Sequence, residues 1–148
     1  MKIFDCHFIK RYLERRASPG LSPYQVIVGF PLYDETRLVE HFTQNEHWYL
    51  YLDISGIAMI KNEPPILHFD TFITLLQLKE TQKTAIKEYL EKLKDLSPLR
   101  YLVLLHEIRS NSEWERDYFP KESIDDAITK LNDEQLKVLK SCTERGNT

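Results

Sequence analysis

The sequence predicts an α+β fold, a helix-rich single domain over residues 1–148 with a small antiparallel sheet of about three strands. Two observations lead to this fold class. Residues 47–61 have the pattern of a β-hairpin, and apolar residues recur at helical spacing through most of the second half. The chain is 42% hydrophobic and 29% charged, which is typical of a globular domain and rules out intrinsic disorder.

The N-terminal third is predicted to hold a helix, a strand and a second, short helix. Residues 5–16 have Phe8 and Tyr12 on one face and basic residues on the other, which indicates an amphipathic helix that a short strand could precede. Residues 24–30 are β-branched and alternating, and indicate a strand. Asp34 is expected to cap a short helix. The apolar side of that helix would carry Leu38, Val39 and Phe42.

The hairpin is the clearest β signal in the chain. Residues 47–54 and 57–61 are the two strands, and Ser55-Gly56 is a two-residue turn between them. In this register Ile54 lies opposite Ile57, and the face with Leu50 and Leu52 belongs to the core. The other face is half-polar and is either covered by a helix or presented to a partner. It carries Tyr49, Tyr51, Asp53, Ala58 and Ile60.

Two segments fit both a helix and a strand. After Pro64-Pro65, Asp70 could cap a helix in which Phe69 and Phe72 share a face, but a buried strand over residues 67–75 fits as well, so residues 66–78 stay open. Ser97-Pro98 is a standard helix start, which favours a helix over residues 99–109. The apolar run inside residues 99–108 would also suit a central strand.

Three further helices are predicted in the C-terminal half. Residues 80–94 form the most secure one, because apolar residues make a continuous stripe along it. Pro120 opens the next helix, a last helix follows residues 132–133, and residues 144–148 are expected to fray. The stripe of the first of these helices consists of Ile86, Tyr89, Leu90 and Leu93.

Most catalytic and cofactor templates are absent from the sequence. There is no G-x-G-x-x-G, P-loop, G-x-S-x-G or C-x-x-C motif, and four glycines are too few to build a phosphate-cradling loop. Asp5 and Lys10 interrupt the N-terminal apolar residues, so we expect no signal peptide. Cys6 and Cys142 are expected to be reduced thiols, and we predict a cytoplasmic protein.

The five histidines do not form a recognisable metal motif. His106-Glu107 begins like a zinc-protease helix, but residue 110 is serine rather than the second histidine. His68 and Asp70 are alternate residues that would share a side on a strand, where the carboxylate could orient the imidazole. Five histidines are ordinary for this length, so we expect no metal site, no cofactor and no catalytic residue.

Charge is distributed unevenly along the chain. Residues 30–70 hold seven acidic residues against two basic ones, and residues 107–126 hold seven against three. Residues 1–20 carry a net charge of +3, whereas the whole chain carries −3. The basic residues of the first helix are most simply a solvated face, so we expect neither nucleic acid nor a membrane as partner.

Aromatic residues lie within both acidic stretches, which favours recognition of a basic protein. Rings supply rigid area that is desolvated on binding, and carboxylates steer the approach of a cationic partner. The predicted binding residues of the first stretch are Glu40, Glu46, Tyr49, Tyr51 and Asp53. Those of the second stretch are Glu113, Trp114, Glu115 and Asp117.

In size, acidity, expected cytoplasmic location and lack of catalytic motifs, the chain resembles the small bacterial immunity proteins that neutralise toxin domains. The resemblance is one of class, and no sequence motif carries it. What it implies is inhibition of a cognate basic toxin, often a nuclease, by tight one-to-one binding. Carboxylates of the inhibitor would then pair with the toxin's lysines and arginines in place of phosphates.

Two other functions fit the sequence. The first is a small hydrolase that uses a histidine and a carboxylate, such as His68 with Asp70. The second is a regulatory or scaffold subunit that docks through its basic N-terminal helix. A concave pocket around a histidine would favour the first function, and self-association or a large apolar patch would favour the second.

Overall fold

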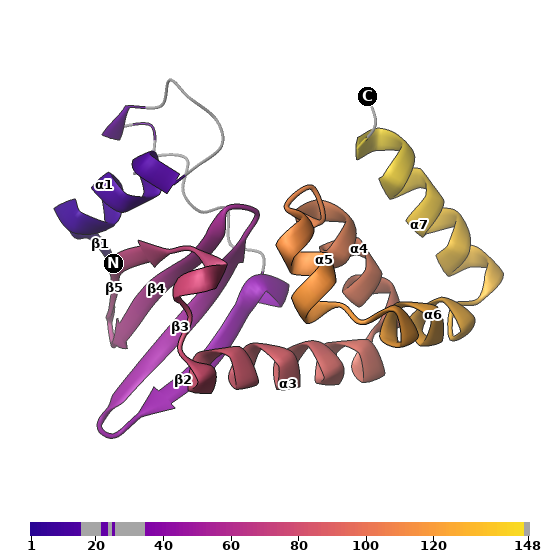
Figure 1. Ribbon diagram of the computed structural model, residues 1–148, viewed down its shortest axis with the longest axis horizontal. Coiled ribbons are helices and arrows are strands. Elements are labelled where there is room, and N and C mark those ends of the chain that lie inside the picture. Colours follow the sequence, from indigo (N-terminus) through magenta and orange to yellow (C-terminus); the bar gives the residue numbers. More distant parts are fainter. Residues whose placement is uncertain (16–21, 24, 26–34, 147–148) are drawn as a thin grey trace. The chain divides into compact units, whose positions relative to one another are not determined.

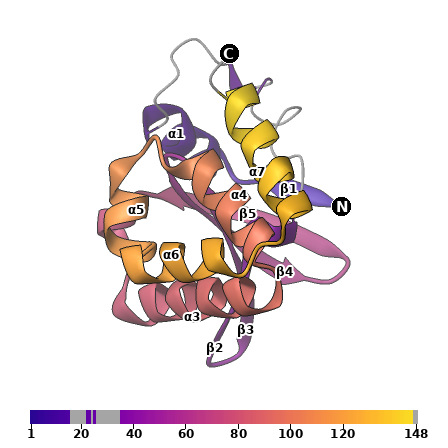
Figure 2. The same cartoon turned by 90° about the vertical axis from the view of Figure 1, so that its right-hand side faces the viewer.

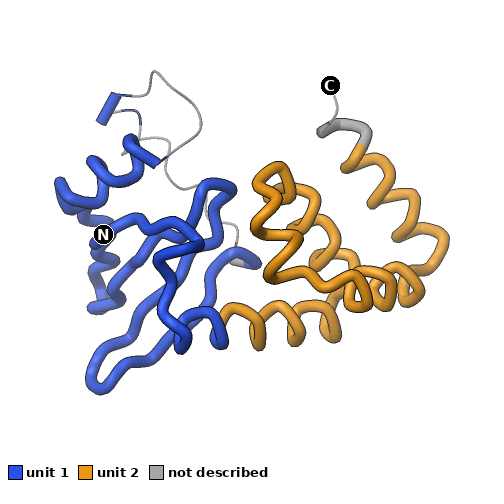
Figure 3. The backbone as a smooth tube through the Cα atoms, in the orientation of Figure 1, with its two compact units in different colours: residues 1–85 blue, residues 86–148 orange. Residues whose placement is uncertain are grey.

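The computed structural model describes residues 1–15, 22–23, 25 and 35–146. Its chain divides into two compact units, residues 1–85 and 86–148 (Figure 3). The strand predicted at residues 24–30 and the cap predicted at Asp34 lie outside the described residues. Within the described part of the chain, every helix is too short or too polar for a transmembrane segment.

The first unit is built on a five-stranded sheet with the order β1-β5-β4-β3-β2 (Figure 1). The fold class is therefore α+β as predicted, but the sheet has more strands than the three expected. It is also mixed, because β1 runs parallel to β5 while the other neighbours are antiparallel. The five strands are β1 (Lys2–Phe4), β2 (Leu38–Thr43), β3 (Glu46–Asp53), β4 (Gly56–Glu63) and β5 (Ile66–Ile73).

The predicted hairpin is present as β3 and β4, but its pairing differs from the predicted register by two residues. Leu52 pairs with Ile57, and Asp53 pairs with Gly56, so the turn residues are Ile54 and Ser55. Because side chains alternate with a period of two, this shift leaves the two predicted faces unchanged. Ile54 alone leaves its predicted place in the core and is 39% exposed.

Residues 38–43 form strand β2, and the helix predicted there is wrong. The sheet is buried on both faces in this region, so Leu38 and Val39 are both covered although they point to opposite sides. Adjacent apolar residues of this kind imitate helical spacing. A short 3₁₀ helix, η1 (Glu35–Arg37), precedes the strand.

Residues 66–73 form strand β5, which settles the first open segment as a strand. Ile60 pairs with Phe69 and Met59 pairs with Thr71, so the register across β4 skips Asp70. An extra residue of this kind puts Phe69 and Phe72, three positions apart, on the same face of the sheet. The irregularity explains why the sequence of β5 also fits a helix.

Helix α1 (Cys6–Arg15) covers one face of the sheet, as the amphipathic pattern predicts. Its Phe8 and Tyr12 are buried, and the Tyr12 ring meets the Phe72 ring edge-on with centroids 5.0 Å apart. The guanidinium of Arg15 donates a hydrogen bond to the Phe72 carbonyl. The sheet residues buried in this cluster are Tyr51, Ala58, Ile60, Phe69 and Phe72.

The second unit consists of helices. Most of helix α3 (Glu80–Leu96) belongs to this unit, because the unit begins at Ile86. The short helix η2 (Leu75–Gln77), which precedes α3 in the chain, belongs to the first unit. Helix α4 (Pro98–Ile108) settles the second open segment as a helix, and the Ser97 hydroxyl accepts the Arg100 N–H as its cap. Around α4 lie α5 (Ser112–Tyr118), α6 (Lys121–Thr129) and α7 (Asp133–Gly146) (Figure 2). Helix α5 was not expected from the sequence.

Gly56 is required by a close approach of β4 to β5. A Cβ atom built on Gly56 would overlap the carbonyl oxygen of Ile73 and lie 3.2 Å from the Phe72 ring.

We therefore expect Gly56→Ala to lower the free energy of unfolding by about 1–3 kcal/mol, because the backbones of β4 and β5 must separate to make room for the methyl group. Urea unfolding measures this loss. The control is Ser55→Ala in the same turn, with an expected change of less than about 0.5 kcal/mol; equal effects of the two variants would contradict this account.

Candidate functional site

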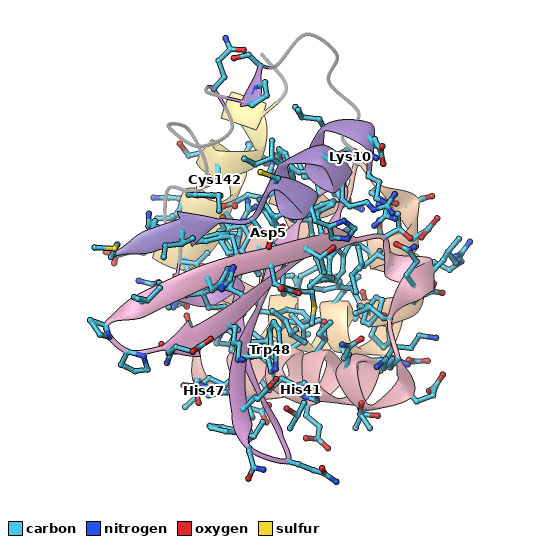
Figure 4. The ribbon with its side chains drawn as sticks, turned by 90° about the vertical axis from the view of Figure 1, so that its left-hand side faces the viewer. Asp5, Lys10, His41, His47, Trp48 and Cys142 are labelled. Atoms are coloured by element: carbon cyan, nitrogen blue, oxygen red, sulfur yellow. The ribbon has the colours of Figure 1, made fainter. Side chains whose placement is uncertain are left out.

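An aromatic and acidic group lies on the α1-covered face of the sheet, toward the β2–β3 turn and away from Tyr12. We call Glu40, Phe42, His47 and Tyr49 the tip surface. Phe42 lies directly opposite His47 in the antiparallel register, and Glu40 lies opposite Tyr49. The Phe42 and His47 rings stack with centroids 4.4 Å apart and an angle of 10°, and the Tyr49 ring is 4.8 Å from His47. Figure 4 labels His47 at this end of the hairpin.

Hydrogen bonding orients the His47 ring beneath Phe42. The Asn62 side-chain nitrogen lies 3.0 Å from His47 Nδ1, and His47 Nε2 is buried without a hydrogen bond, 3.7 Å from a Glu40 oxygen. Phe42 closes over the imidazole and remains 68% exposed. The tip surface therefore presents an exposed ring on an ordered support, with the carboxylate of Glu40 beside it.

The opposite face of the same hairpin end carries a separate group of charges. Lys61 Nζ lies 3.4 Å from Glu46 and 3.3 Å from Glu63. A hydrogen bond to Glu63, helped by one to Glu46, raises the pKa of Lys61, so the group holds one cation between two anions. The indole N–H of Trp48 also donates to Glu46, over 2.9 Å. The net charge of this face of the tip is therefore negative.

The structure brings together two of the five binding residues predicted in the first acidic stretch, Glu40 and Tyr49. Glu46 lies at the same end of the hairpin but on the opposite face. Asp53 lies at the far end of β3, roughly 23 Å along the strand from Glu46, where it accepts the Ser55 N–H. Tyr51 is 6% exposed and belongs to the core under α1, so its ring lies inside the unit.

The second predicted group lies on helix α5 and is largely committed to contacts within the second unit. Trp114 is completely buried. The two Glu115 oxygens accept hydrogen bonds from one Arg109 nitrogen, over 2.9 and 3.1 Å. Arg116 donates to both oxygens of Asp117, and Glu113 is partly buried in the first turn of the helix. This helix therefore presents little unpaired negative charge.

Phe42 and His47 are functional candidates that sequence reasoning missed. Their proximity depends on the β2–β3 pairing, and that pairing was hidden because residues 38–43 resemble a helix. Gln44-Asn45 forms the turn between them and lacks the glycine that marks most two-residue hairpin turns. A usable signal was the continuous apolar and aromatic run of residues 48–52, which is typical of a strand that is buried on both faces and so of an internal strand of the sheet.

One group of three potential metal ligands occurs within the described residues: Asp5, His68 and Asp70. Strand β5 places His68 and Asp70 together, as the strand alternative predicts, and Asp5 reaches them from the end of β1. Figure 4 labels Asp5 just below helix α1. Each side chain is partly exposed.

Comparisons with family models, with curated proteins and with solved structures find no match. The function is therefore argued from the residues of this chain.

The second unit contains an ion-pair network in which a buried lysine joins two half-exposed carboxylates. Lys94, whose side chain is 10% exposed, lies 3.0 Å from Glu91 and 3.4 Å from Asp126. The Ser123 hydroxyl donates to Glu91 over 2.9 Å, so the network ties α3 to α6. Hydrogen bonding to Lys94 lowers the pKa of Glu91, while burial raises the pKa of neighbouring Tyr101 to about 12. Tyr101 therefore remains neutral at physiological pH.

We expect Lys94→Ala to lower the free energy of unfolding by about 1–2 kcal/mol at pH 7, since it removes both ion pairs and the packed alkyl chain. In the folded state the pKa of Glu91 is lowered first by its hydrogen bond to Lys94, and the pKa of Asp126 is lowered first by Lys130 and to a smaller extent by Lys94. Their contribution is thus present above about pH 4 and is lost as the pH falls through the lowered values. In urea unfolding, the difference in the free energy of unfolding between wild type and Lys94→Ala should be smaller at pH 2.5 than at pH 7.

The matched control is Lys92→Ala, an exposed lysine of the same helix, with an expected change of less than about 0.5 kcal/mol at both pH values. If Lys94→Ala were as mild as this control at pH 7, the network would have no stabilising role.

Proposed function

We propose that this chain is a non-enzymatic binding protein that engages a basic protein partner with the tip of its β2–β3 hairpin. The observation that carries the proposal is Phe42, which is 68% exposed and stacked on the ordered His47 ring. An exposed aromatic ring on a rigid support loses little conformational entropy when a partner covers it. It is the kind of residue that contributes most to a binding interface.

The charges around Phe42 favour a cationic partner. Glu40 lies beside the aromatic rings, and Glu46 and Glu63 flank the opposite face, where Lys61 balances one of the two. The hairpin end therefore presents carboxylates on both sides. Such an arrangement steers a basic surface toward the tip, and its effect weakens as salt screens the charges.

A stable interface buries about 800 Å² on each partner, which is more than the four residues of the tip surface supply. The partner must therefore also contact other residues at this end of the sheet, and the exposed Pro64-Pro65 turn lies at the same end as the β2–β3 turn. We infer that the hairpin tip inserts into a basic cleft rather than resting on a flat surface.

A basic cleft that a protruding acidic hairpin can fill is what the nucleic-acid-binding groove of a nuclease offers. We therefore propose an immunity-type role, in which the chain neutralises a basic toxin domain through one-to-one binding. The support for this role is the acidity of residues 30–70, the exposed aromatic ring and the general resemblance to immunity proteins. In such a complex, Glu40 and Glu46 would pair with lysines or arginines that otherwise bind phosphates.

The proposal is tested with the double variant Glu40→Lys, Phe42→Ala. Partners are captured from the native host and identified, and their affinity for the purified full chain is then measured by calorimetry. We expect a basic protein that binds with 1:1 stoichiometry and binds less tightly as salt rises. The double variant should reduce this affinity by about 100-fold or more, because it removes the anchor ring and reverses a charge.

The matched control carries the same type of changes on the second unit, Glu88→Lys and Leu136→Ala, at two exposed positions. It should bind as wild type does. If the tip variant bound the same partner with unchanged affinity, the hairpin tip would be the wrong surface, whatever the control showed.

A further inference from the structure

We propose that Asp5, His68 and Asp70 form a binding site for one divalent transition-metal ion, with zinc as the best match. The ligand atoms of the three side chains lie within 4.8 Å of one another. Ligands of one zinc ion in tetrahedral geometry stand about 3.4 Å apart, given bonds of about 2.1 Å. Side-chain rotations that move each ligand atom by about 1 Å would therefore suffice to bring all three within bonding distance of one ion.

The backbone fixes the three residues relative to one another. Strand β1 is parallel to β5, with Ile3 opposite His68 and Phe4 opposite Phe69. One residue later, the Asp5 N–H donates to the Phe69 carbonyl over 3.0 Å, which holds the end of β1 between His68 and Asp70. Residues that are distant in sequence are thus brought together by sheet pairing, which is stiffer than a loop.

The irregularity of β5 lies within this group. The register across β4 skips Asp70, which has no partner residue on that strand. Extra residues of this kind re-aim side chains and are common beside functional sites. The irregularity therefore falls on Asp70 itself, whose carboxylate is one of the three potential ligands.

The Asp5 carboxylate is oriented by helix α1. Its Oδ1 accepts the His7 N–H over 2.8 Å and so caps the helix, while its Oδ2 lies 3.9 Å from His68 Nε2. A separation of 3.9 Å is too long for a hydrogen bond, so the Asp5 oxygen and the His68 nitrogen could both turn toward a shared ion. The capping bond acts as an outer-shell contact that would hold a metal ligand in place.

The donor set points to the class of metal. One imidazole nitrogen and two carboxylate oxygens suit zinc and similar borderline ions, whereas magnesium and calcium favour oxygen ligands alone. Two carboxylates also neutralise the charge of a divalent cation. Because all three residues are partly exposed, water would complete the coordination, as it does in zinc sites with three protein ligands.

The experiment uses the full chain and zinc chloride alone. Calorimetry should show one zinc ion bound per chain, and differential scanning calorimetry should show a higher melting temperature with zinc. His68→Gln and Asp70→Asn should each weaken zinc binding by about tenfold or more. A millimolar excess of magnesium should not displace the zinc.

Asp5→Ser separates the metal site from the helix cap. Serine caps helices as well as aspartate does, so the melting temperature without zinc should stay within about 2 °C of wild type. Serine lacks the second oxygen that faces His68, so zinc binding should weaken as it does in the His68 variant.

Two controls address other ligands. Cys6→Ser removes the exposed thiol next to Asp5, and His106→Ala removes a histidine of the second unit; both should bind zinc as wild type does. The proposal is overturned if the wild-type chain binds no zinc at 1 mM, if His68→Gln binds it with wild-type affinity, or if binding disappears in Cys6→Ser while the His68 variant retains it. None of these outcomes depends on the partner of the tip surface.

Discussion

The structure of the first unit depends on the packing of a short helix against a longer sheet. Helix α1 has ten residues and is about 15 Å long, whereas a strand of eight residues spans about 26 Å. Tyr12 docks near the β3–β4 turn, where the Phe72, Ala58 and Tyr51 row is buried, and Phe8 docks farther along β5 on Phe69. The residues packed around α1 reach as far as Tyr49, whereas Glu40, Phe42 and His47 at the β2–β3 end of the same face lie outside this cluster.

The difference in length between the helix and the strands explains why the tip surface consists of polar and aromatic residues. Where no described residue covers this face, water contacts it, which favours polar side chains over a continuous apolar surface. The strands place polar and aromatic residues there instead, with the imidazole of His47 between the rings of Phe42 and Tyr49. Asp5 caps the same helix, so the position of the helix also fixes one member of the proposed metal site. The two proposed sites are therefore consequences of one packing arrangement.

The sequence was informative wherever one period dominated the apolar pattern. Helix α3 and the two faces of the hairpin could be predicted because each keeps one period throughout. Strand β2 was wrongly predicted as a helix, because burial on both faces makes Leu38 and Val39 adjacent apolar residues. Strand β5 was left open between helix and strand, because the irregularity at Asp70 puts Phe69 and Phe72 on one face although they are three residues apart. The candidate site was predicted only in part for a related reason. Sequence alone shows that rings and acids occur in the same stretch, but strand pairing decides which rings are exposed.

The central claim is that α1 covers Ala58 and Tyr51 on this face of the sheet and that, among the described residues, Phe42 at the β2–β3 end of the same face stays exposed. Thiol labelling tests it most directly, with single cysteines introduced by Phe42→Cys and Ala58→Cys in a chain that carries Cys6→Ser and Cys142→Ser. The account predicts that the cysteine at position 42 reacts within about tenfold of the unfolded-chain rate, while the one at position 58 reacts about a thousandfold more slowly. Equal labelling rates at the two positions would contradict it.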